Sequence, residues 1–208
     1  MDINELIPKA ENGDKEAQVD LAWRYYCGKG IEQSYEKAVY WYTKAAEQGD
    51  EDAQFNLALF CYFGKGVEQS YEKAVYWWTK SAEQGHAKAQ NNLALCYEKG
   101  KGVEQSYEKA VYWYTKSAEQ GYAETQNNLA LCYEKGNGVE QSYEKAVHWF
   151  AKAAEQGYAD AQFNLALCYY KGEGVEKDYQ QAIYWLTKAE EQGDEEAKRL
   201  KEEIKRLC

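Results

Sequence analysis

Apolar residues recur along the chain at the spacing of amphipathic helices. In residues 89–99, AQNNLALCYEK, apolar side chains stand at Ala89, Leu93, Cys96 and Tyr97. Their successive intervals of four, three and one residues place them on one face of a helix with 3.6 residues per turn. We therefore predict a helix over this segment, and we call it an A helix.

A second helix is predicted after a short turn. Gly100 and Gly102 end the A helix, because glycine accepts the left-handed conformation that a helix C-terminus often requires. Ser106 then precedes a B helix over residues 107–119. Its inward face is formed by residues at helical spacing, namely Ala110, Trp113, Tyr114, Ser117 and Ala118. Two short helices cannot bury both apolar faces alone, so neighbouring pairs must stack.

This helix pair recurs with a period of 36 residues. The segment EQSYEKAV starts at Glu32, Glu68, Glu104 and Glu140, and a weaker copy, EKDYQQAI, starts at Glu176. Such a period is the signature of stacked supersecondary units. We predict one all-α domain, a solenoid of helix-turn-helix repeats. Its predicted parts are a partial repeat (1–13), five repeats (14–49, 50–85, 86–121, 122–157 and 158–193) and a C-terminal capping helix (194–208).

The segment S-Y-E-K in four of the copies also fits S-x-x-K, the serine nucleophile signature of penicillin-binding enzymes. The fifth copy has Asp178 in place of the serine, and aspartate caps a helix equally well but cannot act as this nucleophile. The companion motifs S-D-N and K-T-G are absent from the chain. We interpret these serines as helix N-caps, and we expect neither enzymatic activity nor a cofactor.

The repeat motif resembles a known family. Each copy combines G-x-G-V, a Ser or Asp, K-A-V-Y-W-Y-x-K-A-A-x-Q-G and A-Q-x-N-L-A with small variations, and the pattern covers residues 11–193. It is similar to the Sel-one-like repeats, which are relatives of the tetratricopeptide repeats. The resemblance implies a right-handed superhelix of α-hairpins that acts as an adaptor or scaffold. It also implies that protein or peptide partners bind in a trough lined by the A helices.

Cysteine usage separates this chain from one group within that family. Some bacterial relatives have two cysteines per repeat, joined across the hairpin, and have been credited with β-lactam binding. Here Cys96, Cys132 and Cys168 share one phase, and no B helix contains a cysteine, so that bridge is impossible. We expect buried free thiols in a reducing compartment. The only histidines, His86 and His148, share no phase, and we predict no metal site.

Charge and hydropathy narrow the choice of partners. The formal net charge is −10, with 35 acidic against 25 basic residues, so phosphate backbones and anionic lipid surfaces are repelled. No stretch approaches the roughly 18 consecutive apolar residues of a membrane helix. The first residues, MDINELIPKA, lack the basic start and apolar stretch of a secretory signal. We expect a cytoplasmic protein that binds neither nucleic acid nor membrane.

Binding residues are expected where the repeats differ, on the side of the A helix opposite Leu93. That side contains Asn91 and Leu95, with Asn92 beside them. The predicted trough residues are Trp23, Tyr26, Phe55, Asn56, Leu59, Tyr62, Phe63, Asn92, Leu95, Asn128, Leu131, Asn164 and Leu167. Trp23 and Trp78 both break the phase of the other tryptophans, and Trp23 is the better candidate for a contact residue.

Two alternatives stay open within this set. The leucines in the phase of Leu95 form either a groove floor or contacts between neighbouring A helices. The asparagines in the phase of Asn92 either bind the backbone of a peptide, as matching asparagines do in related tetratricopeptide domains, or bridge adjacent helices. For the whole chain we favour an interaction scaffold over a structural or consensus-designed array without a ligand. A β-lactam-binding enzyme ranks third.

Overall fold

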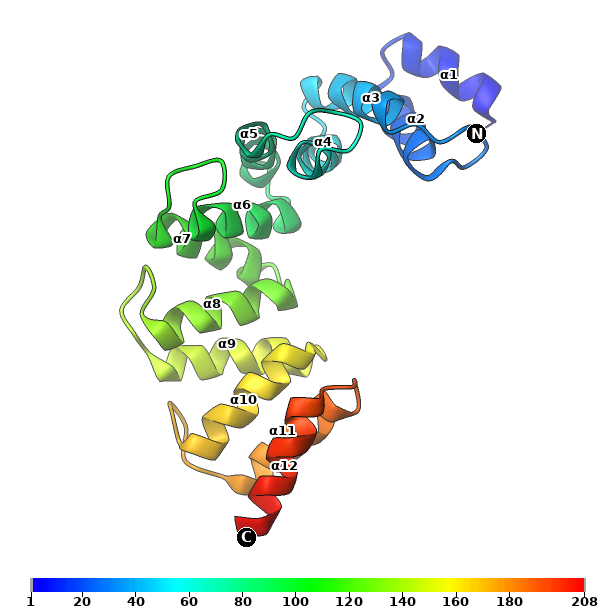
Figure 1. The fold of residues 1–208 in the computed structure, drawn as a ribbon. Coiled ribbons are helices and arrows are strands. Elements are labelled where there is room, and N and C mark those ends of the chain that lie inside the picture. Colours follow the sequence, from blue (N-terminus) through cyan, green and yellow to red (C-terminus); the bar gives the residue numbers. More distant parts are fainter. Residues whose placement is uncertain (1, 208) are drawn as a thin grey trace. The chain divides into compact units, whose positions relative to one another are not determined.

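The chain folds into α-helices throughout. The computed structural model describes residues 2–207, except for the side chain of residue 207, and over these residues it contains twelve α-helices and no strand (Figure 1). The helices are α1 (Ile3–Glu11), α2 (Lys15–Cys27), α3 (Tyr35–Glu47), α4 (Glu51–Phe63), α5 (Tyr71–Glu83), α6 (Ala87–Lys99), α7 (Tyr107–Glu119), α8 (Ala123–Lys135), α9 (Tyr143–Glu155), α10 (Ala159–Lys171), α11 (Tyr179–Glu190) and α12 (Glu195–Leu207). The predicted all-α repeat fold is confirmed.

The helices fall into two compact units where the sequence predicts one continuous domain. Unit 1 comprises residues 1–106 with α1–α6, and unit 2 comprises residues 107–208 with α7–α12. In a repeat array each helix contacts only its neighbours, so compact groups form along the chain. Even-numbered helices are A helices and odd-numbered helices are B helices. In unit 1, α4 packs against both α3 and α5, and in unit 2, α10 packs against both α9 and α11.

The core is built from the predicted inward faces. The A helices bury one leucine each within the repeats: Leu21, Leu57, Leu93, Leu129 and Leu165. On the B helices the most deeply buried large side chain is one residue later than the in-phase tryptophan: Tyr42, Trp78, Tyr114, Phe150 and Leu186. Trp113 is only half-buried, because Tyr114 lies one helical turn after the buried Ala110 and points inward in its place.

The helix caps follow the sequence motif. The side-chain oxygens of Ser34, Ser70 and Ser142 each accept a hydrogen bond from the backbone N–H three residues later, at 3.2, 3.2 and 3.3 Å. Asp178 caps α11 in the same way. The cap interpretation is confirmed at these four positions. Ser106, at the boundary between the units, stays a prediction.

The two glycines after each A helix have different tasks. Gly100 adopts φ +64° and ends α6 in the left-handed conformation, as predicted. Gly102 lies against the backbone at the start of α5, where an added Cβ would stand 2.4 Å from the carbonyl carbon of Tyr71. The loop after α6 therefore packs onto the preceding B helix, and we expect this contact to hold the neighbouring Lys101 in position.

Buried glutamines join three helices at a time, a role that their sequence pattern did not indicate. Gln54 of α4 donates from Nε2 to the carbonyl oxygen of Ala46 in α3, at 3.1 Å. Gln84, at the end of α5, donates from Nε2 to Oε1 of Gln54, at 2.8 Å. The same pair of bonds recurs at Gln126 and Gln156 in unit 2. Each of these buried glutamine amides both donates and accepts a hydrogen bond. The bonds connect a B helix to the A helix on which it stacks.

Candidate functional site

Three adjacent cavities follow the A helices of unit 1, and we call them together the A-helix groove. The first, of about 170 Å³, lies among α4, α5 and α6, and we call it the lysine cavity. The second, of about 140 Å³, lies among α2, α3 and α4. The third, of about 500 Å³, lies between α2 and α4. Leu59 and Phe63 line both the first and the second cavity, and Tyr42 and Asn56 line both the second and the third.

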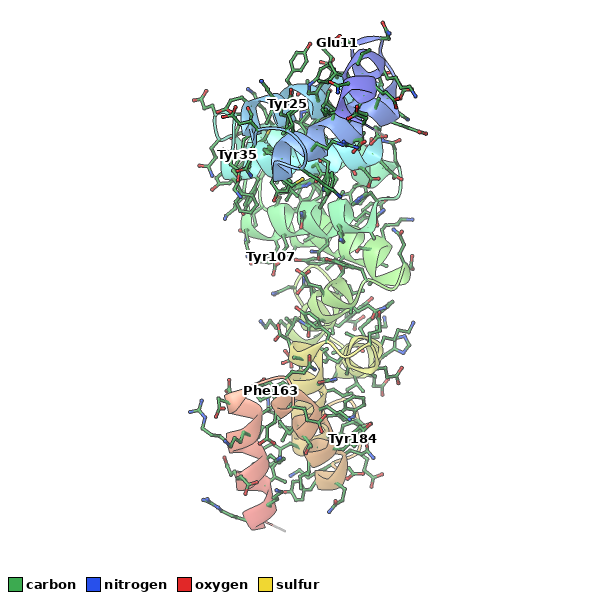
Figure 2. The ribbon with its side chains drawn as sticks, turned by 90° about the vertical axis from the view of Figure 1, so that its right-hand side faces the viewer. Glu11, Tyr25, Tyr35, Tyr107, Phe163 and Tyr184 are labelled. Atoms are coloured by element: carbon green, nitrogen blue, oxygen red, sulfur yellow. The ribbon has the colours of Figure 1, made fainter. Side chains whose placement is uncertain are left out.

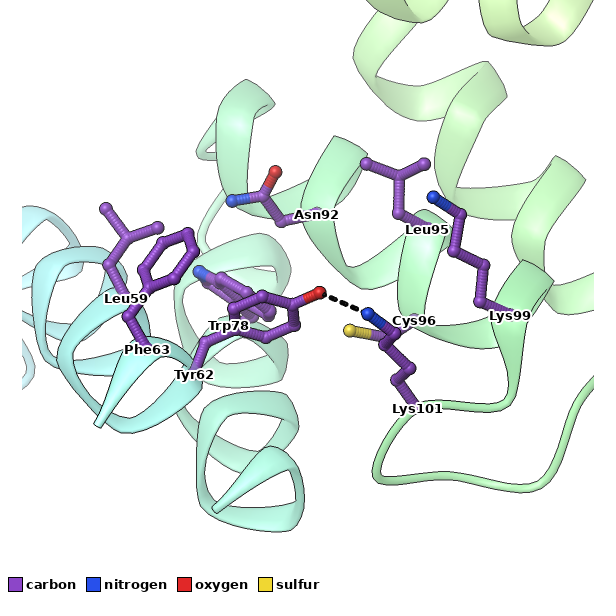
Figure 3. Close-up of a pocket in the computed structure, with 9 residues that line it drawn as sticks. All are labelled: Leu59, Tyr62, Phe63, Trp78, Asn92, Leu95, Cys96, Lys99 and Lys101. Carbon is purple, nitrogen blue, oxygen red and sulfur yellow. Dashed lines mark hydrogen bonds between the residues drawn. The ribbon is translucent and has the colours of Figure 1, made fainter. Parts of the chain in front are cut away.

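The lysine cavity is apolar on its floor and basic at its edge. Its lining residues are Leu59, Tyr62, Phe63, Trp78, Asn92, Leu95, Cys96, Lys99 and Lys101 (Figure 3). Lys101 donates from Nζ to the hydroxyl oxygen of Tyr62 at 3.0 Å, and its ammonium lies 5.4 Å from the ring centres of Tyr62 and Tyr71. The hydrogen bond to Tyr62 is the main cause that holds the pKa of Lys101 above its usual value. The charge at this edge is thus held in place.

Trp78 contributes an unpaired donor to the lysine cavity. Its side chain is 2% exposed, and its Nε1 is the only buried side-chain polar atom in the described part of the chain without a hydrogen-bond partner. Tyrosine, phenylalanine or leucine occupies the same phase in the other repeats. From the sequence we preferred Trp23 to Trp78 as a contact residue. The signal that could have indicated Trp78 is that it breaks the phase of the other tryptophans.

Asn92 adds a second unpaired donor. In unit 2, Asn164 donates from Nδ2 to Oδ1 of Asn127, 37 residues earlier, at 3.0 Å. The residue 37 positions before Asn92 is Phe55, whose ring offers no such acceptor. Over residues 2–207 the side chain of Asn92 makes no hydrogen bond, and it lines the lysine cavity.

The second cavity is aromatic. The Phe60 ring centre lies 5.7 Å from that of Tyr26 and 5.8 Å from that of Tyr42. Burial is the main cause that raises the pKa of Tyr42, so its hydroxyl stays neutral at physiological pH. Asn56 turns its amide back to its own helix, where Nδ2 donates to the carbonyl oxygen of Asp52 at 2.8 Å. This cavity is suited to an apolar side chain.

The third cavity is acidic. Its lining residues are Glu16, Val19, Asp20, Trp23, Tyr42, Asp50, Asp52 and Asn56. Arg24 donates from Nε and Nη2 to the two carboxylate oxygens of Asp20, at 3.1 Å each. Trp23 is 42% exposed, with the Lys29 ammonium 5.1 Å from its ring centre. The groove therefore runs from carboxylates beside α2 to lysines beside α6.

The comparisons with known proteins agree with this architecture. The sequence profile of the Sel1 repeat matches residues 15–50, 51–86, 87–122, 123–158 and 159–194. This chain belongs to the Sel1 repeat family. Each matched repeat begins one residue later than the boundary set from the sequence period. Sel1 repeat proteins generally mediate protein–protein interaction and generally act as scaffolds without enzymatic activity.

Solved structures of this family are similar over most of the chain. The protective antigen c5321 of uropathogenic Escherichia coli is 37% identical with a TM-score of 0.92, over 94% of this chain and 42% of that one. A Sel1 repeat protein from Oxalobacter formigenes is 36% identical with a TM-score of 0.84, over 91% and 75%. Helicobacter pylori cysteine-rich protein B is 26% identical with a TM-score of 0.51, over 63% and 97%. None of the curated proteins compared with this chain matches it.

The Sel1 repeats bring most of the predicted unit 1 residues together in the groove. Those that line it are Trp23, Tyr26, Asn56, Leu59, Tyr62, Phe63, Asn92 and Leu95. Phe55 instead stacks on His86, with ring centres 4.6 Å apart and an interplanar angle of 22°. His86 is held there because its Nδ1 accepts from the backbone N–H of Ala89 at 3.1 Å. Phe55 thus packs against the start of the next A helix.

The predicted residues of unit 2 are more dispersed. Asn128 is half-buried in α8, and Leu131 packs against the buried core of α8–α10. Leu167 lines a separate cavity of about 370 Å³ beside α12, with Phe163, which Figure 2 labels. No unpaired buried donor lies in that cavity among the described residues. Unit 1 therefore holds the better-formed candidate site.

The asparagine prediction needs one correction. Asn91 was expected to face the trough, but it is 2% exposed, and Asn127, which shares its phase, is 4% exposed. The amide of Asn164 bridges α8 and α10 through Asn127, which agrees with the helix-bridging alternative at this position. Asn92 and Asn164 thus share a phase but differ in role.

The other features examined from the sequence are the cysteines, a metal site and a membrane span. Cys61, Cys96, Cys132 and Cys168 are buried free thiols, and Cys27 is an exposed one. Burial raises the pKa of the Cys96 thiol to about 11. Within residues 2–207 no three His, Cys, Asp or Glu side chains gather as metal ligands would, and no helix there has the length and apolarity of a membrane span. From the sequence we also expect a fast-reacting thiol at Cys208, which lies outside the described residues.

Proposed function

We propose that this Sel1 repeat protein is a non-enzymatic interaction module whose A-helix groove binds an extended segment of a partner protein. The observation that carries this proposal is the continuity of the three cavities through shared lining residues. Large exposed aromatic side chains border them: Trp23 and Tyr26 are 42% exposed and Phe63 is 59% exposed. Such side chains commonly dominate interface energetics, and contiguous exposed apolar surface marks interaction sites.

The charges along the groove indicate the kind of segment that fits. Glu16, Asp50 and Asp52 lie at the α2 end, whereas Lys99 and Lys101 lie at the α6 end. A segment with a basic residue at one end, apolar residues in the middle and an acidic residue at the other end matches this order. Electrostatic complementarity of this kind sets the register of a bound segment.

A peptide selection tests the proposal. A random peptide library displayed on phage is selected against the full chain, and enriched peptides are synthesised with both ends blocked and titrated by calorimetry. Phe63→Ala should weaken their binding by about tenfold or more, because this ring borders two of the three cavities. The matched control is Tyr76→Ala on α5, which removes an aromatic ring of similar exposure, 54%, from a B helix.

The outcomes separate the candidate functions. Enriched peptides that require Phe63 but not Tyr76 support the groove. If no peptide is enriched, the array without a ligand becomes the better account. If peptides are enriched but both variants bind them equally well, the peptides bind outside the groove and the proposal fails. Ser34, Ser70 and Ser142 support the non-enzymatic part of the proposal, because their hydroxyls are engaged as helix caps. The cytoplasmic location stays a prediction.

A further inference from the structure

We propose that Trp78 is a specificity-determining residue of the groove, whose indole N–H donates to a backbone carbonyl of the bound segment beside an apolar side chain held in the lysine cavity. This inference rests on the proposed function and assigns its principal polar contact. The starting point is that Trp78 Nε1 is buried without a partner. A buried unpaired donor costs roughly 1–3 kcal/mol, so its presence in a native structure calls for an explanation.

The cavity around Trp78 offers room and a second donor. It has a volume of about 170 Å³, with Leu59 and Leu95 among its apolar walls. The amide of Asn92 lines the same cavity, with no hydrogen bond of its own over the described residues. Two neutral donors beside an apolar space match a peptide group next to an apolar side chain. No such combination occurs in the cavity beside α12.

The chemistry of the donors selects a neutral acceptor. Lys101 is already bound to the Tyr62 hydroxyl, and Lys99 is exposed. Moving a carboxylate down to the buried indole would therefore remove a charge from water without a free counter-ion, which is far more costly than burying a carbonyl. A backbone carbonyl is consequently the acceptor that fits the floor, while an acidic side chain of the segment fits the lysines above.

Phe63 is the exposed ring of this cavity. Figure 3 shows Phe63 and Trp78 among the side chains that line it. Phe63 is the most exposed large apolar side chain of the groove, at 59%, so rotation about its own side-chain bonds meets little resistance. We expect the Phe63 ring to turn against an apolar side chain that enters the cavity.

The test uses nuclear magnetic resonance of the indole N–H groups. The end-blocked peptides from the selection above are titrated into ¹⁵N-labelled full-length protein, and the Trp78 signal is assigned by its loss in Trp78→Phe. Phenylalanine occupies the same phase at Phe150, so the fold accepts it. We expect a downfield shift of the Trp78 indole proton on binding. Trp78→Phe should weaken binding by about tenfold, because the N–H is already desolvated in the free protein and a hydrogen bond to it is gained without that cost.

Trp77→Phe is the matched control. It removes an indole N–H from the adjacent position of α5, where the side chain is only half-buried, and it should leave affinity unchanged. If peptides bind with a dependence on Phe63 but Trp78→Phe binds equally well and the Trp78 signal does not move, this inference is overturned and the proposed function stands. If no peptide is enriched at all, both fail. Unfolding curves of each variant show whether the fold is retained.

Discussion

Single side chains decide how each repeat differs from the next. Positions 92 and 164 are both asparagine in the same phase, but only Asn164 has an asparagine 37 residues before it. Asn164 therefore donates to Asn127, whereas the amide of Asn92 lines the lysine cavity. The function of a residue in this array thus depends on its neighbour in the preceding repeat as much as on its own type.

The buried cysteines give a prediction about reactivity. Burial, aided by Glu134 and Glu173, raises the pKa of the Cys168 thiol to about 12, from an ordinary value of about 9. At pH 8, Cys61, Cys96, Cys132 and Cys168 should therefore react slowly with iodoacetamide, while the exposed Cys27 reacts fast. Mass spectrometry of the native protein over time measures this. Rapid labelling of Cys168 without unfolding would contradict it.

The same shift gives a pH dependence of stability. The pKa of the Cys168 thiol is raised in the folded protein. Its contribution to the free energy of unfolding is therefore fully present below about pH 9 and is lost as pH rises from about 9 to about 12. Above pH 9 the free energy of unfolding should fall more steeply in the wild type than in Cys168→Ala. Urea titrations of both proteins at several pH values measure the difference, and parallel curves would show that the thiol has no part in it.

At the level of helices and loops, the second glycine after an A helix packs on the preceding B helix in every repeat but the first. Gly102 packs on the backbone of Tyr71, and the corresponding Gly66 packs in the same way on that of Tyr35. Gly30 has a similar φ, +75°, but an added Cβ there would meet nothing within 4 Å. Gly30 and Gly102 therefore share a left-handed backbone conformation, but only Gly102 is also packed against a neighbouring backbone.

Alanine substitutions separate those two requirements. Gly30→Ala should lower the free energy of unfolding by about 1–2 kcal/mol, the cost of a left-handed conformation for a residue with a Cβ. Gly102→Ala should lower it further, because its Cβ would also lie 2.4 Å from the Tyr71 backbone. Urea denaturation of both variants provides the measurement. Equal losses would mean that the loop yields freely and that Lys101 is not fixed by this contact.

For the molecule as a whole, stability is carried by contacts between neighbouring helices. Buried leucines and glutamine hydrogen bonds recur in both units, and the glutamine bonds tie a helix to those beside it. The free energy of such an array is approximately a sum over repeats and their interfaces. A local defect should consequently stay local.

Hydrogen exchange tests this locality. Asn164→Ala removes the bridge to Asn127 and should speed amide exchange in α8–α10, with a loss of about 0.5–1.5 kcal/mol in their protection. Protection in α2 and α3 should not change. Asn92→Ala, in the same phase but without a side-chain hydrogen bond to lose over the described residues, is the control and should change protection little. Uniform loss of protection in Asn164→Ala would show that the chain unfolds as one cooperative unit.

Much of this architecture follows from local sequence. The 36-residue period, the helical spacing around Leu93 and the serines before each B helix predict the helices, their inward faces and their caps. Apart from the period itself, these features need only the chain within one repeat, because helical periodicity, capping and the left-handed glycine act over a few residues. The aromatic character of the groove near Trp23, Tyr26 and Phe63 was visible for the same reason.

The identity of the neighbour across each contact was decided only by the tertiary structure. Helical periodicity specifies the face on which a side chain lies, but not which atom of another repeat stands opposite it. The bridge at Asn164, the unpaired indole of Trp78 and the placement of Lys101 over Tyr62 all depend on residues roughly 30 or more positions apart or on their absence. The role of a buried polar atom depends on whether the residues packed against it include a hydrogen-bond partner.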